Sequence, residues 1–237
     1  MIVRSLRLSL PVALLFCLSG PLCAASPSHA TDKVYCIATL SIDPSKSDEF
    51  ESYLNSARIF RTKRGVDLVA GYRIQFGEDA TRLVIWSASD AQKLREALSA
   101  TPPDTHRIVQ SETVEMAELN AVASSKSPAD EGISRPGKVF AIVWVSIDPS
   151  KHDNFVRALK SELPIQSKYG VDLVASYHVQ IGNMAREIDV WSATDAETIR
   201  RGFYAPDSDV PAFNSIIKGE RIEIGELITL PASAQNR

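Results

Sequence analysis

The hexapeptide Gly65-Val-Asp-Leu-Val-Ala70 occurs twice in the chain, the second time as residues 170–175. Extending outward from it, Lys33–Glu96 aligns with Lys138–Arg201 at a constant offset of 105 residues and without a gap. By direct count 30 of the 64 aligned positions are identical, and the strongest blocks besides the hexapeptide are SIDPSK and WSA. A repeat of this length and identity indicates a duplicated structural unit.

The alignment also sets the limits of the two units. After a three-residue insertion it resumes at an offset of 108 residues, pairing Glu112 with Glu220 and Glu115 with Glu223. The segment 122–137 is rich in Ser, Ala, Pro and Gly and holds no aromatic residue, a composition typical of a linker. We therefore expect a first unit over residues 33–121 and a second unit over residues 138–230.

Within each unit the spacing of apolar residues alternates between that of strands and that of helices. Val34–Ile42 is β-branched and largely apolar like a buried strand, and the apolar residues from Phe50 onward follow at helical spacing as far as Gly65. Two strands around a glycine turn come next, and then a helix opened by the capping box Ser89-x-x-Gln92. A last strand closes the unit, so the order is β-α-β-β-α-β, the ferredoxin-like pattern.

One such unit places both helices on the same side of its sheet and leaves the other sheet face uncovered. Two units can bury these faces against each other, and a tandem repeat supplies both units in one chain. We therefore predict an α+β protein in which two tandem ferredoxin-like units pack sheet to sheet as an intramolecular, pseudo-dimeric α/β barrel. A homodimer that exchanges units is the alternative to a monomer, because the linker can span either arrangement.

Residues 1–30 have the layout of a secretory signal peptide. Arg4 and Arg7 give a positive start, an apolar stretch follows, and small residues offer cleavage after Ala24, Ala25 or Ala30. The apolar stretch is broken by Pro and Gly and is shorter than the roughly 20 residues that a membrane span needs. We expect a periplasmic or secreted protein without a stable membrane span after processing.

The charge balance and the cysteines exclude some partners and bonds. The net charge of −3 becomes −5 once Arg4 and Arg7 are removed with the signal peptide. Nucleic-acid binding demands clustered basic side chains, so this class of partner is not expected. Of the three cysteines only Cys36 lies beyond residue 30, so the processed chain has no internal disulfide.

The spacing of glycines, strands and tryptophan resembles a known family. It runs from Gly65 through the strand that ends beyond Tyr72, past Gly77, and on to Trp86 followed by Asp90; the second unit repeats it over residues 170–195. This pattern looks like the NIPSNAP group of the dimeric α/β-barrel superfamily, and the resemblance implies the barrel fold. The wider superfamily includes antibiotic-biosynthesis-type monooxygenases, haem-degrading enzymes and chlorite-dismutase-like haem proteins, whereas NIPSNAP-like members mostly lack an assigned reaction.

Strand alternation assigns side chains to the two faces of each sheet. We expect Cys36 and Ala38 on the first strand, and Ala70, Tyr72 and Ile74 on the second, to pack under the helices. The opposite faces form the barrel interior. The side chains predicted there are Tyr35, Ile37, Thr39, Arg73, Gln75, Val84, Trp86 and Glu115 in the first unit, and Phe140, Ile142, Trp144, His178, Gln180, Asp189, Trp191 and Glu223 in the second.

This predicted interior suggests a ligand site between the two sheets. Ligand sites are mostly apolar, with a few polar groups that fix orientation. The candidate contacts for a small apolar or aromatic ligand are Tyr35, Arg73, Trp86, Phe140, Trp144, Trp191 and Glu223.

His178 and Asp189 are the candidate catalytic residues. A hairpin turn that pairs Ile181 with Arg186 would place them opposite each other, about 5 Å apart at Cβ. Such a pair could orient an imidazole for proton transfer. The first unit has arginine and valine at these positions, so the fold does not require the pair. The competing interpretation is a satisfied polar pair on a partly wet sheet.

The sequence predicts no metal site and leaves the cofactor open. One histidine with two carboxylates on separate strands is too weak a ligand set for a metal. His152, in the first turn of a helix, is predicted to be solvated. Haem is an alternative, with His178 or His106 as the ligand. No nucleophile elbow, phosphate loop, dinucleotide fingerprint or zinc-ligand spacing is present.

Three functions therefore remain open. The first is an exported NIPSNAP-like barrel that binds a small apolar or aromatic ligand in the cavity between the sheets, with no reaction assignable. The second is a cofactor-independent or haem-dependent monooxygenase-type enzyme that uses His178 and Asp189. The third is a structural or oligomerising protein whose barrel is filled by side chains. Differences between the units, above all at Trp144, His178 and Asp189, mark where function is expected.

Overall fold

The computed structural model describes residues 33–76, 81–100, 108–122, 138–205 and 211–230. The predicted signal peptide and linker lie outside these ranges, except for residue 122. In chain order the described elements are β1 (Val34–Ile42), α1 (Ser47–Thr62), β2 (Val66–Phe76), β3 (Thr81–Ala88), α2 (Ala91–Ser99), β4 (Val109–Leu119), β5 (Val139–Ile147), α3 (His152–Lys168), β6 (Asp172–Ile181), β7 (Arg186–Ala193), α4 (Ala196–Phe203), α5 (Pro211–Asn214) and β8 (Ile217–Leu227).

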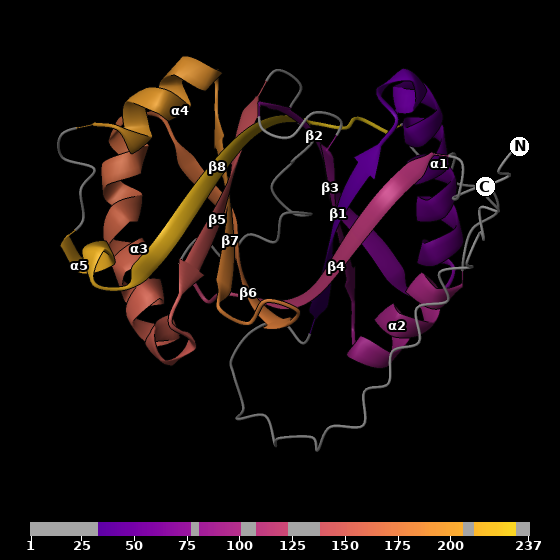
Figure 1. Ribbon diagram of the computed structural model, residues 1–237, viewed down its shortest axis with the longest axis horizontal. Helices are drawn as coiled ribbons and strands as arrows, with labels where there is room; N and C mark the ends of the chain where they lie inside the picture. Colours follow the sequence, from indigo (N-terminus) through magenta and orange to yellow (C-terminus); the bar gives the residue numbers. More distant parts are fainter. Residues whose placement is uncertain (1–32, 77–80, 101–107, 123–137, 206–210, 231–237) are drawn as a thin grey trace, which may run out of the picture.

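The strands close into one barrel in the order β1-β3-β2-β8-β5-β7-β6-β4, and all neighbouring strands are antiparallel. Helices α1 and α2 cover one side of the barrel, and α3, α4 and α5 cover the other (Figure 1). The two halves follow the order β-α-β-β-α-β, with the short α5 added before β8. The predicted fold class, an α+β barrel closed within one chain, is confirmed.

The last strand of each half joins the two halves. β4 pairs with β1 of its own half and with β6 of the other half. β8 likewise pairs with β5 and with β2. Because a closed barrel has no free strand edge, every strand finds hydrogen-bonding partners on both sides.

Aromatic rings from both halves fill the middle of the barrel. The Tyr35 and Tyr177 rings meet edge to face at 5.2 Å between centroids, and the Tyr72 and Phe140 rings are tilted at the same distance. Each of these four side chains is at most 2% exposed. Aliphatic side chains, Ile37 among them, complete this cluster. The rings therefore occupy the space in which the sequence suggested a ligand.

The faces of the first and last strands are as predicted. Tyr35 and Phe140 face the interior, whereas Cys36 packs beneath the helices. Glu115 and Glu223 pair with Ile37 and Ile142 across β4 and β8, which places them on the interior side.

The predicted faces of the second strands are wrong beyond a bulge. The register shifts between Leu68 and Ala70 in β2 and again at the equivalent point in β6. A bulge adds one residue, so the alternation of faces is reversed after it. Ala70, Tyr72 and Ile74 therefore line the interior, while Arg73 forms an ion pair with Glu51 of α1. The same reversal turns His178 toward α3.

The predicted faces of β3 and β7 are also wrong. Val84 and Trp86 belong to the cluster beneath α1 and α2, and Trp191 belongs to the cluster beneath α3 and α4. Asp189 pairs with Val143, which also packs beneath the helices. All eight residues of β3 are buried, among them Thr81, Arg82 and Ser87, so the sequence carries no alternation of buried and exposed positions from which to read the orientation. Among the described residues, no helix is long and apolar enough to cross a membrane.

The seam between β8 and β2 depends on the small size of Gly225. A Cβ at Gly225 would lie 2.8 Å from the backbone oxygen of Arg73, whereas a Cβ at Gly219 of the same strand would meet nothing within 4 Å. Gly225→Ala must push the two strands apart, and we expect it to lower the free energy of unfolding by about 1–3 kcal/mol, as overpacking does. Gly219→Ala should leave it unchanged or raise it by about 0.5 kcal/mol. Urea unfolding measures both variants, and equal losses would contradict the role of the seam.

Candidate functional site

Polar side chains gather on the helix-facing side of β6 and β7. Ser176 and His178 of β6 lie opposite Asp189 and Glu187 of β7, respectively. Residues two apart on a strand share a face, so all four side chains point to the same side. The predicted contact between His178 and Asp189 is wrong, because the register is shifted by two residues. The last residue pair of this hairpin is His178 with Glu187, and Gly182 in the connection between the strands has a positive φ of 116°, which suits glycine.

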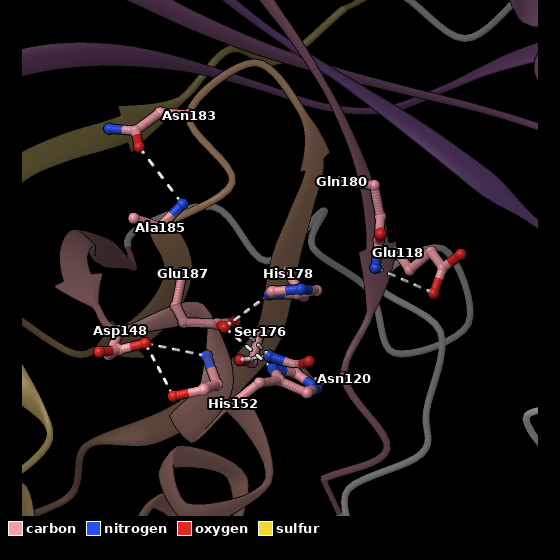
Figure 2. A network of polar contacts seen from close by, with 11 residues as sticks. Glu118, Asn120, Asp148, His152, Ser176, His178, Gln180, Asn183, Ala185 and Glu187 are labelled. Atoms are coloured by element: carbon pink, nitrogen blue, oxygen red, sulfur yellow. Dashed lines mark hydrogen bonds and ion pairs between the residues drawn. The ribbon is translucent and has the colours of Figure 1, made fainter. Parts of the chain in front are cut away.

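Glu187 is the centre of a buried hydrogen-bonded cluster. Its Oε1 lies 2.6 Å from Nδ1 of His178 and 3.0 Å from Nδ1 of His152, the first residue of α3 (Figure 2). Its Oε2 accepts a hydrogen bond of 2.9 Å from Asn120, which also donates to Ser176. The two imidazole rings lie 4.1 Å apart between centroids. We call His152, His178, Glu187 and Asn120 the His–Glu cluster.

The His–Glu cluster is buried at its carboxylate and partly open at its imidazoles. The Glu187 side chain is 0% exposed, and those of His178 and His152 are 15% and 30% exposed. His152 was predicted to be solvated, but its side chain is half-buried and hydrogen-bonded to Glu187. Burial raises the pKa of Glu187, but the hydrogen bonds from His152, His178 and Asn120 outweigh burial and leave this pKa below its ordinary value. The hydrogen bond to Glu187 raises the pKa of His152.

A cavity of about 330 Å³ adjoins this polar surface, between the sheet of the second half and helices α3, α4 and α5. Its walls combine aromatic rings and aliphatic side chains with carboxyl groups. The lining residues are Val143, Val145, Phe155, Glu162, Asp189, Trp191, Phe203, Tyr204, Phe213, Asn214, Ile217, Glu220 and Ile222. Among the described residues, then, three acidic side chains and no basic one face this cavity, which we call the outer cavity.

Asp189 is the most deeply buried of the three acids. It is 3% exposed, and its Oδ1 has no hydrogen-bond partner among the described residues. Burial raises the pKa of Asp189 well above its usual range, a hydrogen bond with Ser176 opposes this shift, and the carboxyl groups of Glu187 and Glu162 add to it. A buried polar atom without a partner is costly, so it marks a position where a ligand atom could be bound.

The first half carries a cation of its own near the equivalent tryptophan. The guanidinium of Arg61 lies over the ring of Trp86, 4.4 Å from the centroid. Burial raises the pKa of Glu112, and the charge of Arg61 partly opposes this increase. The second half has Gln166 in place of Arg61.

The second half also adds acidic groups where the first half is apolar. Glu162 and Asp189 stand at the positions of Ala57 and Val84. Together with the replacement of the arginine, these differences leave acidic side chains and no basic one among the described residues that line the outer cavity.

The structure brings together only some of the seven residues predicted to bind a ligand. Tyr35, Phe140 and Trp144 belong to the interior cluster, whereas Trp86 and Trp191 lie beneath the helices of opposite halves. Arg73 binds Glu51. Trp144 donates a hydrogen bond of 2.9 Å to Glu223, and Arg186 and Arg221 lie over its ring.

Four residues of these sites were missed by the sequence analysis, namely Asn120, His152, Glu162 and Glu187. The signal that could have found three of them is the comparison of the two units. Ser47, Ala57 and Arg82 of the first unit correspond to His152, Glu162 and Glu187. Each change introduces a residue able to ligate or to carry charge.

The pKa of Glu162 gives the outer cavity a measurable pH dependence. Burial raises this pKa from 4.5 to about 7, against a hydrogen bond from Gln166, and Glu220 adds to the increase. The folded chain therefore holds this proton more tightly than the unfolded chain. The contribution of Glu162 to the free energy of unfolding is fully present below pH 4.5 and is lost as the pH rises toward 7. Glu162→Gln should gain stability relative to the wild type between pH about 5 and about 8, by up to about 3 kcal/mol.

Urea unfolding of the wild type and of Glu162→Gln, each at pH about 5 and about 8, measures this gain in the free energy of unfolding. Glu197→Gln, which removes an exposed carboxyl of α4, is the matched control and should show no comparable gain. A difference between Glu162→Gln and the wild type that does not change with pH would contradict the assignment.

No protein-family model and no curated protein matches the sequence. Solved structures match the fold over most of the chain. A monooxygenase-like protein from Lactobacillus acidophilus is 13% identical with a TM-score of 0.59, over 83% of this chain and 94% of that protein. An anthrone oxidase-like protein is 12% identical with a TM-score of 0.64, over 84% and 92%. Chlorite dismutase from Candidatus Nitrospira defluvii is 12% identical with a TM-score of 0.56, over 84% and 92%.

Identities this low establish the fold alone. The structural neighbours of this chain are therefore dimeric α/β-barrel proteins of the monooxygenase-like and chlorite-dismutase-like kinds.

Proposed function

We propose that this protein is an exported, NIPSNAP-like barrel that binds a small organic cation in the outer cavity. The observation that carries the proposal is the buried Asp189, whose Oδ1 has no partner among the described residues and which lines a cavity walled by aromatic rings. The sequence suggested a ligand between the sheets. The interior rings pack against one another there, which favours the outer cavity as the ligand site.

The chemistry of the walls selects the ligand class. Asp189, Glu162 and Glu220 present acidic groups, and no basic side chain among the described residues lines the cavity to neutralise them. The face of an aromatic ring attracts cations, with tryptophan the strongest, and Trp191 is part of the wall. A ligand that joins an ammonium or guanidinium group to an apolar or aromatic body would satisfy both kinds of surface.

The first half supports this choice because the cation that contacts its tryptophan is a side chain of the protein itself. There Arg61 supplies a guanidinium to Trp86. The second half keeps the tryptophan and the glutamate, as Trp191 and Glu220, and lacks the arginine. The bound cation would thus take the role that Arg61 has in the first half.

The alternative, a monooxygenase-type enzyme that uses His178 and Asp189, has the support of the fold neighbours. The two side chains belong to different groups, however, since His178 is bonded to Glu187. Haem does not fit the outer cavity, because the one residue of a haem-ligating type among the described lining residues is the exposed Tyr204, and the walls present three acidic groups to an apolar macrocycle.

Benzylammonium tests the proposal, and uncharged benzyl alcohol of nearly the same size is the matched control ligand. We expect benzylammonium to bind and to change the tryptophan fluorescence, and benzyl alcohol to bind at least about 10-fold more weakly. A hydrogen bond to a charged group contributes roughly 1.5–3 kcal/mol, so Asp189→Asn should weaken benzylammonium binding by about 10- to 100-fold. Calorimetric titration of the full chain gives the affinities.

Two variants complete this experiment. Asp189→Val introduces the residue of the first unit and should abolish the preference for the cation. Glu197→Gln removes an exposed carboxylate outside the outer cavity and should leave the affinity unchanged. Equal binding of benzylammonium and benzyl alcohol, or an unaltered affinity in Asp189→Asn, would refute the proposed site.

A further inference from the structure

The geometry of the His–Glu cluster points to a second, separate site, and we propose that His152, His178 and Glu187 bind a divalent transition-metal ion. One ligand atom from each residue lies within 4.8 Å of the other two. Both Nδ1 atoms approach the same carboxylate oxygen, at 2.6 and 3.0 Å. In a tetrahedral site with ligands at about 2.1 Å, neighbouring ligand atoms are about 3.4 Å apart, so side-chain movements below about 1 Å would admit the ion.

The three ligands are held by different elements. Glu187 and His178 are on adjacent strands of the barrel, and His152, the first residue of α3, points toward them from that helix (Figure 2). Ligands carried on paired strands keep their geometry better than ligands on loops. His152 is 30% exposed, so the cluster is reached from solvent on this side.

Asn120 holds the carboxylate of Glu187 in place at the oxygen that faces away from the histidines. It donates to Oε2 of Glu187, the oxygen that does not contact the histidines, and to Oγ of Ser176. Such supporting hydrogen bonds orient a ligating carboxylate and increase the affinity of a site for its metal. Three protein ligands leave a coordination position for water, as in His₂Glu sites generally.

The equivalent positions of the first unit show that the fold does not require this cluster. They are Ser47, Arg73 and Arg82, and Arg82 donates to Ser47 at 2.9 Å. Where the first half has a guanidinium, the second has the fully buried carboxylate of Glu187. With neutral imidazoles the cluster carries one buried negative charge, which a bound cation would compensate.

The ligand atoms select the class of metal. Two imidazole nitrogens and one carboxylate oxygen suit Zn²⁺, Ni²⁺, Cu²⁺ or Fe²⁺, whereas Ca²⁺ and Mg²⁺ prefer oxygen ligands alone. The cluster should therefore discriminate strongly between Zn²⁺ and Mg²⁺. The competing interpretation is a purely structural hydrogen-bonded network, which would bind neither ion.

Titration of the full, untagged chain with Zn²⁺ after treatment with a chelator tests the inference. We expect one Zn²⁺ per chain, an increase in Tm in its presence, and no heat with Mg²⁺. His152→Ser, which introduces the first-unit residue, and Glu187→Gln should each weaken Zn²⁺ binding by at least about 100-fold, and Asn120→Ala by about 10-fold, the range seen for supporting residues. His152 is partly exposed, so its variant stays informative if Glu187→Gln does not fold.

The control variant is Glu118→Gln, which removes one carboxylate near His152 that is not a proposed ligand. It should change the Zn²⁺ affinity by less than about threefold, since a nearby charge in a wet environment contributes little. No Zn²⁺ binding, or binding that His152→Ser leaves unaltered, would overturn the inference. Asp189→Asn should weaken benzylammonium binding but keep Zn²⁺ binding, so the two proposals stand or fall separately.

Discussion

Strand pairing across the two seams is the interaction on which the rest of this molecule depends. β4 reaches β6, and β8 reaches β2, so the two sheets become one barrel without a free edge. Closure buries the aromatic rings of both halves against each other. Closure also fills the barrel interior with apolar side chains. Polar side chains can therefore gather on the helix-facing surfaces of the sheets. The His–Glu cluster and the outer cavity both lie on such a surface, in the second half.

The two halves carry different charged groups beneath their helices. In the first half the positions beneath the helices hold apolar side chains or arginines with nearby partners, such as Arg73 with Glu51. In the second half the corresponding positions hold Glu162, Glu187 and Asp189, of which Glu187 is satisfied by the cluster and Asp189 is not. Burying acidic groups destabilises a fold unless they are paired, so these residues are kept at a cost.

The repeat alone was sufficient to predict the barrel, because duplication and the β-α-β-β-α-β order leave few ways to cover two sheet faces. The faces of β1 and β5 were also predictable, because aromatic side chains lie on only one face of each strand and small or aliphatic ones occupy the other. Two local features hid the rest. The bulges near Leu68 and Leu173 reverse the alternation of faces, and no sequence signal shared by the two strands marks them. The register of the β6–β7 hairpin decides whether His178 meets Glu187 or Asp189, and a shift of two residues in the pairing separates these outcomes. Comparison of the two units pointed to His178 and Asp189, but their partners depended on that register.

The seams also bear on how the chain reaches its native state. Ile74 pairs with Gly225 of β8, so β2 stays without one neighbour until β8 has been made. Until then the first half presents the uncovered face of its sheet, with the Tyr35 and Tyr72 rings on it, to whatever surrounds it. Contacts between residues so distant in sequence form slowly, and exposed apolar sheet faces promote association with other chains. A chain of this topology is therefore most prone to association before β8 has been made, and the order of synthesis makes the first half the one that waits.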